Sequence, residues 1–158
     1  MARIVAGVDG SRQSQRALQW AVDEAQVHGW EVEAVYVFEH TPSWQLYAYG
    51  EGMTVGGEQW AQENRDATAR TARALVDEMI AEVDNPHRVP IAAIVIEDRR
   101  PARALVERSR TAQMLVVGSR GRGGFTGLLL GSVGQQCAQY AECPLVLLRQ
   151  RDEEDDGR

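Results

Sequence analysis

Five short apolar runs divide the chain, and longer segments with apolar residues at helical spacing lie between them. The runs are continuously apolar rather than alternating with polar residues, which is typical of strands buried on both faces of a parallel sheet. They cover residues 4–8, 32–38, 89–96, 114–117 and 145–148. The pattern therefore predicts five strands that alternate with helices.

The helical spacing is clearest after the first run. A helix is expected to begin near Ser11 or Ser14 and to end at Gly29. Its apolar face carries Ala17, Leu18, Ala21, Val22 and Ala25.

Three further helices are expected. The second covers 58–83, and Pro86 follows it as a stop signal. Pro101 suits the first position of a third helix, and a fourth begins at Ser132. The expected apolar side of the second helix carries Ala67, Thr71, Ala74, Leu75, Met79 and Val83.

This alternation predicts an α/β doubly wound fold, a five-stranded parallel sheet in the order 3-2-1-4-5 with helices on both faces. In that order, the direction in which successive strands are added reverses between strands one and four. Ligands bind at such a point, outside the carboxyl ends of the strands. Asp9 follows the first strand, and Gly118 follows the fourth. We therefore expect these two positions to face one crevice.

A glycine cluster supplies the candidate chemistry of this crevice. Gly118-Ser119-Arg120-Gly121 comes directly after the fourth run, and Gly131-Ser132 follows nine residues later. Glycines let the backbone approach a ligand closely, and the N–H groups at a helix start attract anions such as phosphate. The spacing indicates a nucleotide.

Composition removes several classes of protein. The 158 residues fit one domain, and all 17 basic side chains other than histidine are arginines, so no P-loop lysine exists. A net charge of -6 with no basic cluster argues against nucleic-acid binding. The acidic residues 152–156 are expected to lie in a solvated, disordered tail over 150–158. No apolar run approaches membrane-spanning length, and the expected location is the cytoplasm.

The motifs together resemble the universal stress protein family. They are Val8-Asp9-Gly10-Ser11, the Gly-x2-Gly-x9-Gly-Ser spacing from Gly118 to Ser132, and the final stretch 141–148. The resemblance covers residues 2–149 and implies one domain over 1–149 with a Rossmann-like, adenine nucleotide alpha hydrolase-like fold. The glycine spacing is similar to that of the ATP-binding branch of the family.

The resemblance also implies roles for individual residues. Asp9 would contact the ribose or another part of adenosine, and the backbone near Val37 would face adenine. Gly118 and Gly121 would line the ribose and the α-phosphate, and the backbone N–H groups of Gly131, Ser132 and Val133 would face the outer phosphates with a divalent ion, Mg²⁺. Arg120 and Arg122 could clamp phosphate as forked donors or simply be solvated. The implied residues of the glycine segment are Gly118, Ser119, Arg120, Gly121, Arg122, Gly131, Ser132 and Val133.

One position departs from the family pattern, because Gly134 stands where a hydroxyl residue is common in the ATP-binding branch. ADP, AMP and cyclic AMP therefore stay open as ligands beside ATP. Asp9 and Ser132 also have simpler interpretations as helix caps. For Ser132 the two roles are compatible, since a capping serine would face the crevice.

The sequence is compatible with three functions. The leading hypothesis is an adenine-nucleotide-dependent regulatory switch in the stress response, with a protein partner that the sequence does not identify. The alternatives are a slow ATP hydrolase or phosphotransferase, and a dimerisation module that binds no nucleotide. The run 145–148 is expected at a sheet edge, and the resemblance implies a homodimer joined through it.

The remaining chemically active residues favour structural roles. Cys137 and Cys143 are expected to be buried thiols, and no metal-ligand spacing joins the three histidines. The long segment 44–60 carries four aromatic residues and several glycines. It could be a lid over adenine, a partner-binding loop or ordinary surface packing.

Overall fold

A computed structural model describes residues 1–39, 57–120 and 130–149. The predicted acidic tail, Gly121, Arg122 and most of the segment 44–60 lie outside these residues. The described elements are β1 (Arg3–Val8), α1 (Arg12–His28), β2 (Glu31–Phe38), α3 (Gly57–Ala81), β3 (Ile91–Glu97), α4 (Pro101–Ser109), β4 (Met114–Gly118), α5 (Ser132–Tyr140) and β5 (Leu145–Leu148). None of the described helices is long and apolar enough to cross a membrane.

The strands form one five-stranded sheet in the order β3-β2-β1-β4-β5. Every neighbouring pair is parallel, with β1 between β2 and β4. The predicted order 3-2-1-4-5 is therefore confirmed. It places the carboxyl ends of β1 and β4 side by side.

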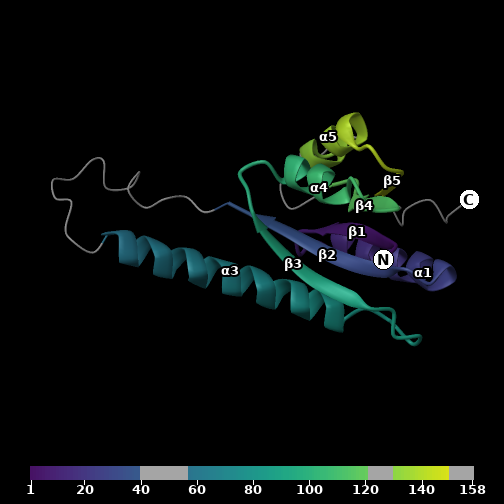
Figure 1. Cartoon of the computed structure of the whole chain (residues 1–158), viewed down its shortest axis with the longest axis horizontal. Coiled ribbons are helices and arrows are strands. Elements are labelled where there is room, and N and C mark those ends of the chain that lie inside the picture. Colours follow the sequence, from purple (N-terminus) through teal and green to yellow (C-terminus); the bar gives the residue numbers. More distant parts are fainter. Residues whose placement is uncertain (40–56, 121–129, 150–158) are drawn as a thin grey trace, which may run out of the picture.

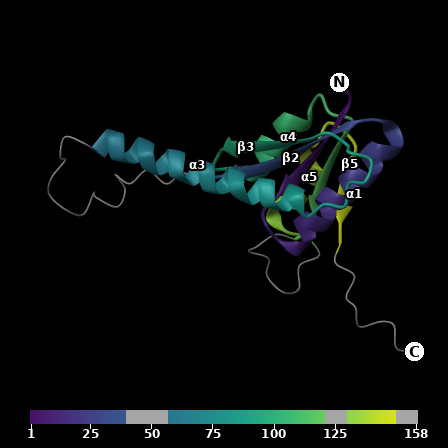
Figure 2. The ribbon, with the colours of Figure 1, turned by 90° about the horizontal axis from the view of Figure 1, so that it is seen from below.

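Helices cover both faces of the sheet, as Figures 1 and 2 show. Alternate strand residues pack to opposite sides, so Ile4 and Ala6 of β1 belong to the core under α1 and α3, and Val5 belongs to the core under α4 and α5. The two cores share the sheet as their common wall. This is the doubly wound arrangement that the alternation of elements predicted.

Helix α1 begins and ends where its sequence signals indicate. The hydroxyl of Ser11 caps the helix by accepting the N–H of Ser14 at 3.1 Å. Gly29 ends it in the left-handed conformation, with φ of 67°. The apolar face expected from the spacing is buried in the core: Ala17, Leu18, Ala21, Val22 and Ala25.

Strand β3 starts two residues later than predicted, at Ile91 rather than Val89. The reason is a side chain that pairs with the backbone of Val89. Asn85 Oδ1 accepts the N–H of Val89 at 2.8 Å, and Asn85 Nδ2 donates to the carbonyl of Val89 at 2.9 Å. Val89 is thus buried in the turn and takes no part in the sheet ladder.

The buried face of α3 differs from the expectation. Ala72, Val76, Met79 and Val83 are buried in a stripe with spacings of four, three and four, which continues past the end of the helix. Thr71 and Ala74, which were expected inside, are exposed. Small or weakly apolar side chains such as alanine and threonine fit either of two neighbouring stripes on the helix. Packing of the larger Val76 against the sheet determines which stripe is buried.

The amino-terminal part of α3 reaches past the edge of the sheet in both views (Figures 1 and 2). An ion pair of 2.5 Å between Arg65 and Glu97, the last residue of β3, joins the helix to the end of the sheet. Before Arg65, hydrogen bonds four residues apart support the exposed helix, including Gln62 to Asp66 at 3.0 Å.

Candidate functional site

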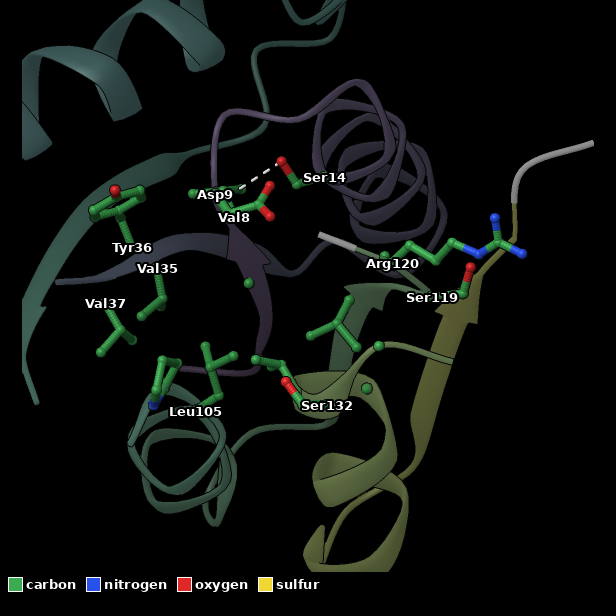
Figure 3. Close-up of a pocket in the computed structure, with 17 residues that line it drawn as sticks. Val8, Asp9, Ser14, Val35, Tyr36, Val37, Leu105, Ser119, Arg120 and Ser132 are labelled. Carbon is green, nitrogen blue, oxygen red and sulfur yellow. Dashed lines mark hydrogen bonds between the residues drawn. The ribbon is translucent and has the colours of Figure 1, made fainter. Parts of the chain in front are cut away.

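A cavity of about 380 Å³ opens at the carboxyl ends of β1, β2 and β4 (Figure 3). It lies at the predicted point where the strand order reverses between β1 and β4. Its volume is within the range of about 300–1,000 Å³ that small-molecule sites occupy. Its walls come from four parts of the fold: Gly7, Val8, Asp9 and Ser14; Val35, Tyr36 and Val37; Pro101 and Leu105; and Val117 to Arg120 with Gly131 to Gly134.

Most of the residues singled out from the sequence meet in this cavity. Those that line it are Asp9, Val37, Gly118, Ser119, Arg120, Gly131, Ser132 and Val133. Gly121 and Arg122 lie outside the described residues, so the structure leaves their expected roles as predictions. Residues far apart in the chain therefore form one wall, as the predicted topology required.

Sequence reasoning missed the α4 side of the cavity. Pro101 and Leu105 line it together with Gly7, a glycine inside β1. A Cβ added to Gly7 would lie 2.9 Å from Leu105 Cδ1 and 2.9 Å from Val117 Cγ1. A glycine in the middle of an apolar strand signals such a close approach, so this contact was open to prediction.

One end of the cavity is apolar. Figure 3 shows Val35, Val37 and Leu105 around this end, on β2 and α4. Tyr36 points away from these valines, because neighbouring residues on a strand face opposite sides. The valine and leucine side chains form a surface suited to a flat apolar group such as a purine base.

The acidic residue of the cavity belongs to a turn before α1. Asp9 Oδ1 accepts the N–H of Ser11 at 2.9 Å, and the N–H of Asp9 donates to the Ser14 hydroxyl at 3.2 Å. The Ser14 hydroxyl in turn donates to the carbonyl of Ser11 at 2.9 Å. Ser11 is the cap of α1, so Asp9 does not cap it directly. The turn holds the Asp9 carboxylate at the wall of the cavity.

Another part of the cavity wall is the start of α5. Gly131 is the cap of this helix, and Ser132 is its first residue, so the interpretation of Ser132 as the cap is wrong. Gly131 has the extended backbone of a cap, and glycine is among the residues accepted at this position. The first N–H groups of a helix have no partner inside the helix, which makes this end attractive to anions.

Two of the expected phosphate contacts, those of the Gly131 amide and the Arg120 side chain, differ in the structure from the expectation. The N–H of Gly131 donates to the carbonyl of Ser119 at 2.6 Å, so this amide is already used within the protein. Arg120 lines the cavity, and in Figure 3 its guanidinium points away from the middle of the cavity toward the end of β5. The amides of Ser132 and Val133 are therefore the better placed anion donors.

The described residues contain no group of three or more His, Cys, Asp or Glu side chains arranged to hold a metal. His28 stacks on Trp30 with ring centroids 4.3 Å apart and pairs with Glu24 at 3.0 Å, which agrees with a structural role. Cys137 is fully buried, as expected, and Cys143 is half-buried beside the same core.

A parallel sheet with a cavity at its point of reversal defines a doubly wound α/β domain with a candidate ligand site at its carboxyl edge. The sequence places that domain more narrowly. The chain belongs to the universal stress protein family, because the model of the "Universal stress protein family" matches residues 1–149. The resemblance found in the sequence motifs is thus confirmed at the level of the family.

Among curated relatives, universal stress protein Rv2623 of Mycobacterium tuberculosis is 37% identical over 150 residues. The match covers 94% of this chain and 46% of the relative, so the chain spans about half the length of the curated relatives it matches.

Solved structures share the fold. UspA from Lactobacillus plantarum has a TM-score of 0.70 at 20% identity, covering 94% of this chain and 97% of that one. A universal stress protein in complex with cAMP has a TM-score of 0.58 at 22% identity, covering 95% and 98%. The universal stress protein from Archaeoglobus fulgidus in complex with dAMP has a TM-score of 0.52 at 19% identity, covering 94% and 97%.

Proposed function

We propose that the chain binds an adenine nucleotide, with ATP as the leading ligand, and acts as a nucleotide-dependent switch in a stress response. The observation that carries this proposal is the make-up of the cavity. Apolar side chains suited to a base and a helix start suited to phosphate line the same cavity, with one carboxylate in the wall. The complexes of two structural neighbours with cAMP and dAMP support adenine nucleotides as the ligand class.

The proposal gives each part of the cavity a task. Val35, Val37 and Leu105 would pack against adenine, and the Asp9 carboxylate would accept hydrogen bonds from ribose hydroxyls. The N–H groups of Ser132 and Val133 would donate to phosphate oxygens. A helix dipole alone contributes only about 0.3–1 kcal/mol at an exposed site, so these direct hydrogen bonds must supply most of the phosphate affinity.

Mg²⁺ would fit this site only when it is bound together with the phosphates of the nucleotide. Asp9 is the carboxylate among the described lining residues, and those residues include no metal-binding cluster. Mg²⁺ commonly binds through one or two carboxylates, substrate phosphates and water. The nucleotide would therefore bring most of the oxygen ligands, and the ion would neutralise phosphate charge.

We also propose that the chain forms a homodimer through β5. Pro144 and Leu148 turn their carbonyls toward β4, where they accept the N–H groups of Leu115 and Ser119. Backbone groups alternate in direction along a strand, so those of Leu145 and Leu147 face the open edge. A second copy with the same edge could satisfy them in a twofold contact.

The first experiment is denaturing extraction of the purified chain, with chromatography of any released nucleotide, followed by calorimetric titration with ATP, ADP, AMP and cyclic AMP. Recovery or titration of an adenine nucleotide supports the proposal. No binding of any of these would leave the dimerisation module as the better hypothesis. Loss of ATP over hours with Mg²⁺ would favour the slow hydrolase or phosphotransferase.

Asp9→Asn tests the site itself. Asparagine keeps the oxygen that accepts the N–H of Ser11, so the turn is retained while the charge is removed. We expect about tenfold weaker nucleotide binding, because a hydrogen bond to a charged group contributes about 1.5–3 kcal/mol. Asp23→Asn, on the exposed side of α1, is the matched control and should bind like the unaltered chain. Equal affinities for the two variants would contradict the ribose role of Asp9.

A further inference from the structure

Gln13, the second residue of α1, reaches the segment that follows β4. Its side-chain oxygen, Oε1, accepts the backbone N–H of Arg120 at 2.8 Å. The same oxygen lies 3.5 Å from the hydroxyl of Ser119, which donates to it. One side chain thus links the helix that follows Asp9 to the glycine segment on the other side of the cavity.

The backbone at Gly118 is shaped for this contact. A Cβ added to Gly118 would lie 3.2 Å from Gln13 Cβ and 3.2 Å from the carbonyl oxygen of Arg120. That spacing is tighter than nine in ten real Cβ contacts, so a side chain at this position would push its neighbours apart. The absence of a side chain at Gly118 therefore lets α1 come close enough for Gln13 to reach Arg120.

Two backbone hydrogen bonds hold the same short stretch from other directions. The N–H of Ser119 donates to the carbonyl of Leu148 at 2.7 Å, at the end of β5. The carbonyl of Ser119 accepts the N–H of Gly131, the cap of α5, at 2.6 Å. Ser119 is itself 3% exposed. Of the three supports, only the one from α1 is made by a side chain that substitution can remove.

We propose that Gln13 is a positioning residue of the candidate site, which holds Gly118–Arg120 against α1 and so fixes the phosphate half of the cavity relative to the Asp9 half. This inference rests on the proposed function for the identity of the ligand. It predicts that loss of the Gln13 side chain weakens phosphate binding more than nucleoside binding. The reason is that the Asp9 turn has its own hydrogen bonds to Ser11 and Ser14.

The first arm of the test needs no ligand. Amide hydrogen exchange is measured by NMR in the unaltered chain, Gln13→Ala and the matched control Gln19→Ala. Gln19 makes the same kind of contact from the same helix, since its Oε1 accepts the N–H of Asp84 at 2.9 Å. We expect the Arg120 amide to exchange at least tenfold faster in Gln13→Ala only, and the Asp84 amide to do so in Gln19→Ala only.

The second arm titrates the same three proteins with ATP and with adenosine. Gln13→Ala should bind ATP about five- to tenfold more weakly, the effect of one lost hydrogen bond, while its adenosine affinity stays within twofold. Gln19→Ala should match the unaltered chain for both ligands. A structural role alone would not change the ratio of the two affinities.

Each outcome decides the matter. Unchanged exchange at Arg120 in Gln13→Ala overturns the inference, and so does faster exchange with an unchanged ratio of ATP to adenosine affinity. If the unaltered chain binds neither ligand, the proposed function fails, whereas the exchange rates still decide whether Gln13 holds the segment.

Discussion

At the scale of single residues, Gly7 determines how closely α4 can approach the sheet. Its missing side chain leaves room for Leu105 and Val117, both of which line the cavity. Interiors are packed so densely that one added methyl group has to displace its neighbours. The width of the apolar end of the cavity is therefore set by a residue that contributes no side chain.

Gly7→Ala is expected to lower the free energy of unfolding by about 1–3 kcal/mol, the usual cost of overpacking a core. Urea denaturation measures the change. In a Leu105→Ala background the cost should be smaller, because the Cδ1 atom 2.9 Å from the new methyl group is gone. The same cost in both backgrounds would mean that this contact is not the cause.

Cys137 makes stability depend on alkaline pH. Burial, with a smaller effect of Cys143, raises the pKa of the Cys137 thiol from 9.0 to about 11. Between these values the unfolded chain releases the proton and the folded chain keeps it, so stability falls as pH rises. The loss is small below about pH 8, and its slope at higher pH cannot exceed about 1.4 kcal/mol per pH unit.

The check is urea denaturation across this pH range, with Cys137→Ala as the comparison. The substitution shifts the baseline stability, but it should remove the part of the alkaline slope that the thiol causes. Parallel slopes in the two proteins would show that other groups are responsible.

At the scale of elements, an ion pair joins α4 to the amino-terminal part of β2, at the end of the strand remote from the cavity. Arg108 Nε and one terminal nitrogen each lie 2.8 Å from an oxygen of Glu33, whose side chain is 14% exposed. This hydrogen bonding raises the pKa of Arg108 above its ordinary value. Arg3 of β1 contacts the same carboxylate at 3.2 Å, so one acid serves two guanidinium groups.

Glu33→Ala should therefore lower the free energy of unfolding by about 1.5–3 kcal/mol, since it leaves the Arg108 guanidinium without its acceptor and the partly buried Arg3 without its counter-ion. Arg73→Ala is the comparison. It removes an exposed pair with Asp77 on α3 and should change stability by less than about 0.5 kcal/mol. Thermal or urea denaturation of both variants distinguishes the two kinds of pair.

The elements differ in how far their sequence determined them. Strand order followed from the alternation of apolar runs with helical segments. The face of α1 followed from apolar spacing, because Leu18 and Val22 lie four residues apart with the three alanines beside them. The face of α3 did not, since alanine and threonine fit either stripe. The start of β3 depended on Asn85 binding the backbone of Val89, which apolar spacing does not report.

The residues of the candidate site also differ in how well the sequence predicted them. Asp9 and the glycine segment were found because strand ends carry recognisable polar and glycine signals. Leu105 was missed because a leucine on a helix looks the same in a core as in a cavity wall. The cap at Gly131 rather than Ser132 was missed because both residue types cap helices, and tertiary hydrogen bonding from Gly131 to Ser119 decides which one does.

At the scale of the whole molecule, the sheet has two edges, β3 and β5. The proposed homodimer uses β5, so a charge placed on that strand should prevent association. Val146→Lys is expected to give monomers in sedimentation velocity at micromolar concentration, because the twofold contact would bring two like charges together. Ala92→Lys places the same charge on β3 and should leave the dimer intact. Circular dichroism of both variants would check that they fold.

Monomers for the unaltered chain under these conditions would refute the homodimer. Loss of association in Ala92→Lys alone would move the interface to the opposite edge of the sheet.

The link from Ser119 to the carbonyl of Leu148 also has a consequence for the order in which the molecule is made. A chain emerging from the ribosome presents Asp9 and its turn early, whereas the acceptor that anchors Ser119 is among the last residues of the sheet to appear. A nascent chain that has not yet reached Leu148 therefore has the acidic half of the cavity without a secured glycine half. Synthesis itself delays completion of the site until the final strand has joined the sheet.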